Sequence, residues 1–225
     1  MPFCMEMHFH TAEVSPCGNV PAAEAVRAYR ERGYSGVVVT DHYAKYNFDR
    51  FPGSWTDKLA AWLTGYRAAK HEGEAIGLAV MLGMELRLGG DNAPVNEYLV
   101  YGVTEGQLAA SPALWELDEP GLAALARENG WLVAQAHPFR PGMRRPLPFP
   151  FDGVEVYNGN KRHNSHNEEA RAFCREQGRI PLSGSDFHEW EDLARGGLRL
   201  EEPIAGSAAL IRALRAGTYG LIETP

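Results

Sequence analysis

Short apolar segments alternate with longer segments of helical pattern along most of the chain. This alternation predicts β-α-β units, because parallel strands need a long crossover connection that is usually a helix. About seven such strands would form either a closed α/β barrel or an open doubly wound sheet. No G-x-G-x-x-G motif follows the first strand, which weakens the case for a nucleotide-binding sheet. The predicted strands are Met5–His10, Gly36–Thr40, Ala79–Leu86, Tyr98–Val103, Trp131–Ala136, Gly153–Tyr157, Ile180–Ser183 and Tyr219–Glu223, and the predicted helices are Pro21–Arg32, Thr56–Glu72, the segment from Asp118 to Gly130, Ser165–Gln177 and Ser207–Ala216.

The length and composition fit one globular domain. A chain of 225 residues is long enough for a single α/β barrel, and 44% hydrophobic with 23% charged residues is an ordinary composition. No segment reaches the ~18 consecutive apolar residues of a membrane span. The N-terminus has neither the basic nor the apolar region of a signal peptide. We therefore expect a single domain over residues 1–225, with no membrane span.

The number of cysteines bears on the cellular compartment of the protein, and the net charge bears on the kind of partner it binds. Cys4, Cys17 and Cys174 are odd in number and widely spaced, so neither a disulfide framework nor a Cys-rich zinc site is predicted. This usage favours the reducing cytoplasm. The net charge is −7, and a protein that grips a nucleic-acid backbone usually shows a basic face. A long nucleic acid is therefore a poor candidate partner.

Residues that can bind metal follow or end five of the predicted strands. His8 and His10 are two positions apart in a strand, so their side chains share one face. In a β/α barrel, the C-terminal strand ends converge on one mouth. Seven nitrogen and oxygen ligands there are too many for one tetrahedral zinc ion and suit two or three ions of zinc, manganese or iron. The candidate ligands are His8, His10, His42, Glu85, His137, Asp186 and His188.

The alternative for any one histidine is an ordinary packed or surface residue. That interpretation is preferred for His71 and His166, which follow no predicted strand. For the seven candidate ligands together this interpretation fails. A buried group of polar side chains without hydrogen-bond or metal partners costs several kcal/mol of folding free energy. A metal cluster would supply such partners.

The same residues carry a resemblance to a known family. His8-Phe9-His10-Thr11, Thr40-Asp41-His42, Gly83-Met84-Glu85, Ala136-His137-Pro138-Phe139 and Gly184-Ser185-Asp186-Phe187-His188 resemble, in order, the motifs of the PHP (polymerase and histidinol phosphatase) family. The resemblance implies a distorted (β/α)7 barrel, a site for two or three ions and phosphoester hydrolysis. It implies one ion on His8, His10, Glu85 and Asp186, a second shared by Glu85 and His137, and a third on His42 and His188.

Two positions depart from the family pattern. The family usually has His or Asp five or six residues after the H-x-H pair, where this chain has Ser15 and Pro16. Glu13 and Cys17 flank those positions and are candidate replacements. The family also often has a histidine where Glu97 stands here, so Glu97 is a further candidate ligand or else a solvated strand-edge residue.

Phosphate recognition needs cationic groups beside the metals. Arg140 follows His137, and Arg195 follows His188 in a stretch that resembles the family's Arg/Gly-containing tail. Arginine can bind phosphate through two hydrogen bonds, so we favour these two. Lys161 and Arg162 follow another strand end and are expected to be surface residues.

The expected reaction is hydrolysis of a phosphoester by a hydroxide that bridges two ions. Asp186 and His188 are candidates for moving protons, although ligation is the main role expected of both. The expected substrate is a small phosphorylated metabolite, either a phosphomonoester or a nucleotide, because 22 basic residues face 29 acidic ones and are mostly scattered. Two alternatives stay open: an amidohydrolase-type metal enzyme, which also begins with H-x-H on a barrel strand, and a non-catalytic metal-binding module.

Overall fold

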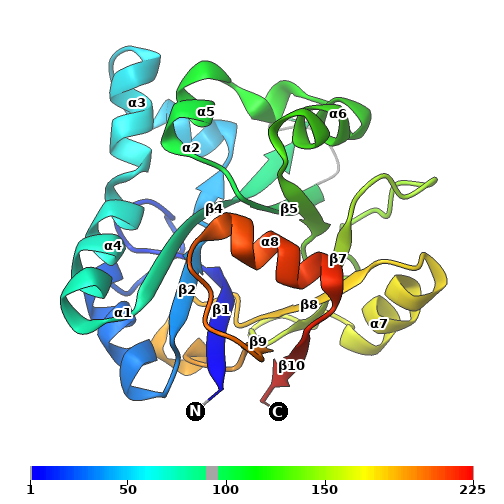
Figure 1. Cartoon of the computed structure of the whole chain (residues 1–225). Helices are drawn as coiled ribbons and strands as arrows, with labels where there is room; N and C mark the ends of the chain where they lie inside the picture. Colours follow the sequence, from blue (N-terminus) through cyan, green and yellow to red (C-terminus); the bar gives the residue numbers. More distant parts are fainter. Residues whose placement is uncertain (1, 90–95, 225) are drawn as a thin grey trace.

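The strands form one sheet that curls into a barrel. The computed structural model describes residues 2–89 and 96–224. Within these residues ten strands pair in the order β10-β9-β1-β2-β4-β5-β6-β7-β8, and β3 pairs with β4 (Figure 1). The strands are β1 Phe3–Phe9, β2 Gly36–Val39, β3 His42–Tyr43, β4 Ala79–Leu88, β5 Asn96–Tyr101, β6 Leu132–Gln135, β7 Gly153–Asn158, β8 Ile180–Gly184, β9 Gly196–Leu200 and β10 Tyr219–Glu223.

The sheet nearly closes where the ends of β1 and β8 meet. Phe9 forms a parallel bridge with Phe187, just beyond β8. His10 N–H donates to the Phe187 carbonyl (3.0 Å), and Phe187 N–H donates to the His8 carbonyl (3.1 Å). These bonds bring two ligand-bearing strand ends side by side and confirm the predicted distorted barrel.

Helices lie around the outside of the sheet (Figure 1). No helix in the described part of the chain is long and apolar enough to cross a membrane. The predicted helix after Asp118 is confirmed: Asp118 accepts from Gly121 N–H as its N-cap, and Gly130 ends it at φ 71°. The helices are α1 Ala22–Glu31, α2 Lys45–Asp49, α3 Trp55–Trp62, α4 Thr64–Ile76, α5 Glu105–Ala110, α6 Glu119–Asn129, α7 Asn167–Glu176 and α8 Ser207–Ala216.

The structure differs from the prediction in the direction of some strands and in one helix. β5 runs antiparallel to both β4 and β6. The segment 89–95 before it is too short for a helical crossover, so an antiparallel return is the available connection. β9, which was not predicted, pairs antiparallel with β1 and β10. The single predicted helix Thr56–Glu72 is two helices, α3 and α4, which meet at Leu63.

In β4 the inward-facing row of side chains changes from apolar to polar along the barrel. The row runs Met81, Gly83, Glu85 and Arg87, since alternate residues share a face. Met81 belongs to the interior apolar cluster, which α8 joins through Leu210 and neighbouring residues. The polar part of the β4 row therefore lies toward the opposite end of the barrel.

The reversed direction of β5 brings Glu97 to the same end. Glu97 lies at the start of β5 and pairs with Arg87 near the end of β4, whereas Leu99 pairs with Glu85. Because β5 is antiparallel to β4, its first residues lie beside the last residues of β4. Glu97 thus lies at the ligand-bearing mouth of the barrel because β5 begins there, whereas the parallel strands end there.

Candidate metal centre

Four buried side chains place their donor atoms at the spacing of a metal's ligands. His8 Nε2 lies 3.1 Å from His10 Nε2, 3.3 Å from Glu85 Oε1 and 3.4 Å from Asp186 Oδ1. His10 Nε2 lies 3.4 Å from Glu85 Oε2 and 3.5 Å from Asp186 Oδ1. A tetrahedral ion with ligands at about 2.0–2.1 Å holds neighbouring ligand atoms about 3.3–3.4 Å apart. This group therefore fits one ion.

The other ring nitrogens of both histidines are held by buried partners. His8 Nδ1–H donates to Glu155 Oε1 (2.8 Å). Ser15 Oγ–H donates to Asp41 Oδ1 (2.8 Å), which leaves the Ser15 oxygen to accept from His10 Nδ1–H (3.1 Å). Such contacts fix the tautomer and the ring orientation of a metal-binding histidine. Both Nε2 lone pairs consequently point to the shared site.

A second group forms around the other side of Glu85. Glu85 Oε1 lies 3.0 Å from His137 Nε2, and Glu97 Oε2 lies 3.7 Å from that nitrogen. Glu97 is 8% exposed, so it is a buried residue of the site and not a solvated strand-edge residue. Glu85 therefore has oxygen atoms in both groups.

Several buried atoms at this junction have no hydrogen-bond partner among the described residues. They include Glu85 Oε2, His42 Nδ1 and His137 Nδ1. Glu85 Oε2 and His42 Nδ1 are only 2.8 Å apart, yet their geometry is not that of a hydrogen bond. Unpaired buried polar atoms are costly, and cations between these groups would satisfy those that face them. The side chains present therefore fit a metal cluster.

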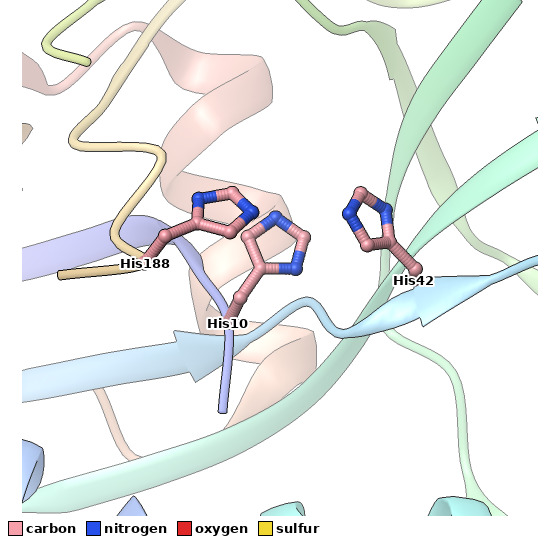
Figure 2. A group of neighbouring side chains, drawn as sticks. All are labelled: His10, His42 and His188. Carbon is pink, nitrogen blue, oxygen red and sulfur yellow. The ribbon is translucent and has the colours of Figure 1, made fainter. Parts of the chain in front are cut away.

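A third group consists of imidazoles and one thiol. Figure 2 shows the rings of His10, His42 and His188 gathered together, and each can offer one nitrogen within 4.8 Å of the others. His188 Nδ1–H donates to the Asp186 carbonyl (2.9 Å), so Nε2 is the nitrogen that His188 can offer to this group. Cys17 Sγ lies 3.3 Å from His42 Nε2. Burial raises the pKa of Cys17, but hydrogen bonds to His188 and His42 outweigh it and bring this pKa to about 6.

Two candidate ligands have a positive φ. His137 has φ 26° and Asp186 has φ 51°, in a region that non-glycine residues adopt uncommonly and that His and Asp adopt more often than most. Both residues lie just beyond a strand end, at the turns that bring their side chains into the mouth.

The carboxylates of the centre are held in the ionised form that binds metal. Burial raises the pKa of Asp186, but His8, Arg140 and His188 outweigh it and hold that pKa well below its usual range. Glu85 behaves in the same way, because His8 and His42 outweigh its burial. Both side chains therefore stay negative at neutral pH.

Metal uptake is expected to release protons. Burial and the neighbouring histidine rings hold the pKa of His10 well below its usual range, so His10 is neutral at neutral pH. Burial lowers the pKa of His8 as well, but the carboxylates around it, Asp186 foremost, raise it well above its usual range. The metal-free protein thus carries on His8 a proton that an ion must displace, and metal affinity should rise with pH until the pKa of His8 is passed. Calorimetry of zinc binding in buffers of different ionisation enthalpy counts these protons, and binding without proton release would contradict the prediction.

Glu155 is expected to set the affinity of the centre without touching the metal. Its Oε2 also accepts from His137 N–H (2.9 Å), so it orients two candidate ligands. Glu155→Gln removes its charge and should weaken metal affinity about 10- to 100-fold, measured by competition with a chelator. Glu128→Gln, at an exposed position of α6, is the matched control. Equal affinities for the two variants would count against this role.

A cavity of about 310 Å³ opens over the centre. Tyr46 and the arginines Arg87, Arg140 and Arg162 are part of its lining. The candidate ligands in the lining are Cys17, His42, Glu85, Glu97, His137, Asp186 and His188. Arg140 Nη2 donates to Asp186 Oδ2 (2.7 Å), Asn158 Oδ1 (3.2 Å) and Ser165 Oγ (3.2 Å). Its guanidinium is thus fixed at the edge of the metal centre.

Two other predicted residues have different contacts. The Arg195 guanidinium donates to the carbonyls of Gly159 and Thr224 (3.0 Å each), and Arg195 is not among the cavity-lining residues that the structure describes. Glu13 accepts from Ala22 N–H at the start of α1 through both carboxylate oxygens. Arginine beside carbonyls and glutamate at a helix start are stabilising arrangements, so these two residues are assigned to the fold.

Sequence reasoning missed several residues of the site. Arg87 lines the cavity, and its position two residues after Glu85 in a strand is the signal that could have identified it. Glu155, Asp41 and Ser15 support the histidine rings through contacts between distant parts of the chain, for which the sequence carries no local signal.

Comparisons with known proteins support a family and a fold. A PHP-associated family model matches residues 164–219, which include Asp186 and His188. No curated protein was found to match the sequence.

Three solved structures share the fold at low sequence identity. One, from Bifidobacterium adolescentis and described as a metal-dependent phosphoesterase, is 16% identical over 94% of this chain and 95% of its own, with a TM-score of 0.53. An amidohydrolase from Chromobacterium violaceum, with bound sulfate and no metal, is 14% identical over 94% and 96%, with a TM-score of 0.57. The lesion-specific endonuclease EndoQ from Pyrococcus furiosus is 17% identical over 98% of this chain and 58% of its own, with a TM-score of 0.62. The match over residues 164–219 and the shared fold support the resemblance of this chain to the PHP (polymerase and histidinol phosphatase) domain family.

Proposed function

We propose that this protein is a metal-dependent phosphoesterase that hydrolyses a small phosphorylated metabolite, either a phosphomonoester or a nucleotide. The observation that carries the proposal is the spacing of 3.1–3.5 Å among donor atoms of His8, His10, Glu85 and Asp186. The three free cysteines fit the reducing cytoplasm as its location.

The proposed ligand sets follow the three groups of side chains. His8, His10, Glu85 and Asp186 would hold one ion, and Glu85, Glu97 and His137 a second. His42 and His188 would hold a third. Imidazole and carboxylate ligands suit zinc, manganese or iron.

Arg140 has the position that the reaction requires of a cation. Divalent ions bound in the centre would supply a low-pKa water and stabilise the charge on the phosphoryl oxygens. Arg140 would donate N–H groups to those oxygens from beside Asp186, where its contacts to Asn158 and Ser165 hold it in place. Asp186 and His188 are the side chains through which a proton could leave the site, in addition to their role as ligands.

The cavity size and the charge favour a compact substrate. A volume of about 310 Å³ is at the low end of ligand pockets, which run from about 300 to 1,000 Å³. Contacts to a long nucleic acid would need several cations along a groove, and of the arginines that line the cavity Arg162 is paired with Glu189 and Asp192. One or two arginines at the mouth fit a single phosphate group.

Amide hydrolysis and nucleic-acid cleavage are the alternative activities. The similarity in fold to an amidohydrolase and to an endonuclease gives each a reason to be tested.

A substrate panel with a salt titration tests the proposal. Protein loaded with zinc, manganese or iron is assayed on phosphomonoesters, nucleotides, oligonucleotides, amides and lactones. We expect turnover of a small phosphoester, with kcat/KM nearly independent of salt between low and physiological ionic strength. Turnover of oligonucleotides alone with a steep salt dependence would reject the small substrate, and turnover of amides or lactones alone would reject the phosphoesterase.

A further inference from the structure

We propose that Cys17, His42 and His188 form a third cation site with a thiolate ligand, and that this site selects zinc over manganese. The proposal rests on the metal cluster of the proposed function. It adds that the metal sites differ in their ligands: one site has thiolate and imidazole ligands, and the two neighbouring sites have carboxylate ligands as well.

The side chains of this group already converge. Cys17 Sγ lies 3.3 Å from His42 Nε2. A zinc ion with sulfur at about 2.3 Å and nitrogen at about 2.0–2.1 Å would hold those two atoms about 3.5 Å apart. The His188 ring is fixed through Nδ1 by the Asp186 carbonyl, so Nε2 is its candidate ligand atom. Figure 2 shows His42 and His188 on either side of His10.

His42 connects this group to the carboxylate sites, because one ring nitrogen faces Glu85 and the other faces Cys17. It is 8% exposed, and its buried Nδ1 has no hydrogen-bond partner among the described residues. Its ring turns Nδ1 toward Glu85 Oε2 (2.8 Å) and Nε2 toward Cys17. The His42 imidazole thus lies between the carboxylate sites and the thiol. A metal ion on either side would give one of its ring nitrogens a partner.

The loop that carries Cys17 is tied to the segment that carries His188. Gly18 N–H donates to the Ser15 carbonyl (2.9 Å), which closes a tight turn around Cys17. Asn19 N–H donates to the His188 carbonyl (2.8 Å). Position 18 requires glycine, because a Cβ there would lie 2.7 Å from the Thr11 carbonyl oxygen. The thiol is therefore held in place by the backbone and does not hang from a free loop.

The donor atoms differ in kind across the cluster. The two neighbouring sites draw on the carboxylates of Glu85, Glu97 and Asp186. The third offers a thiolate and two imidazoles, with no carboxylate in the proposed set. Soft thiolate ligands favour zinc, whereas carboxylates suit manganese and other hard ions. Metal preference should accordingly differ between the sites of one molecule.

Cobalt(II) titration of the metal-stripped protein tests the thiolate directly. A Co²⁺ ion bound to thiolate gives a charge-transfer band in the near ultraviolet, which cobalt on imidazole and carboxylate lacks. We expect the band in the wild type, in Cys4→Ser and in Cys174→Ser, and its loss in Cys17→Ser. A band that survives in Cys17→Ser would overturn the proposal.

Zinc and manganese affinities test the selectivity. Cys17→Ser should weaken zinc binding at the third site at least about 100-fold, since even partners outside the ligand shell change affinity 10- to 100-fold. Cys17→Asp should keep a third ion without the charge-transfer band and shift the preference toward manganese. An unchanged zinc-to-manganese preference in both variants would refute the selectivity.

The outcomes separate this proposal from the proposed function. Cobalt that binds the wild type and supports phosphoester turnover without a thiolate band would reject the thiolate site and leave the phosphoesterase standing. Protein that binds no cobalt and shows no metal-dependent turnover would reject both.

Discussion

Glu85→Gln is expected to collapse the metal centre. The Glu85 oxygens lie 3.3 Å from His8 Nε2, 3.0 Å from His137 Nε2 and 2.8 Å from His42 Nδ1, so one carboxylate serves every group of ligands. The amide keeps the shape but loses the charge and one oxygen donor. We expect the bound metal to fall to about one ion or fewer, and turnover to fall at least about 100-fold, more than for loss of a supporting partner. Elemental analysis and steady-state kinetics measure the two effects.

Glu97→Gln is the matched comparison for this prediction. Glu97 lies 3.7 Å from His137 Nε2 and belongs to the proposed second site only. Glu97→Gln should therefore remove no more than one ion and should lower turnover less than Glu85→Gln does. Wild-type metal content and turnover in Glu85→Gln would refute the bridging role, and circular dichroism establishes that both variants are folded.

Arg140→Ala is expected to lower kcat/KM about 100-fold or more with little loss of metal. Arg140 donates to Asp186 Oδ2 at 2.7 Å and lines the cavity, so its remaining N–H groups are placed to meet a phosphate bound to the metals. Removing one such preorganised donor typically costs about 100- to 1,000-fold in rate. Arg140→Lys should recover only part of the loss, because lysine lacks the planar pair of donors.

Arg195→Ala is the control for that variant. The Arg195 guanidinium is occupied by the Gly159 and Thr224 carbonyls, so kcat/KM should stay within a few-fold of the wild type. An equal loss in both arginine variants, or none in Arg140→Ala, would contradict the assignment.

The parts of the fold and of the metal centre that depend on short sequence patterns were predictable. His8 and His10 share a strand face, and His42, Glu85, His137, Asp186 and His188 each stand at or just beyond a strand end, so a barrel brings them together. The same alternation puts Arg87 beside Glu85, and it could have been identified in that way.

The remaining features depend on contacts that no local pattern encodes. The position of Glu97 follows from the antiparallel return into β5, which is set by the short connection 89–95 and by pairing with β4. The role of Glu155 depends on which nitrogen of His8 faces it across the barrel. Arg195 binds the Thr224 carbonyl because the chain end packs beside it, and its sequence neighbours contain no sign of that.

Metal titration of the stripped protein, with phosphoester hydrolysis as the readout, tests whether the protein is a metal-dependent phosphoesterase. We expect no hydrolysis without metal and full recovery at two or three equivalents of zinc, manganese or iron per chain. Hydrolysis that persists in the stripped protein, or wild-type protein that never binds as much as one ion per chain, would contradict this expectation.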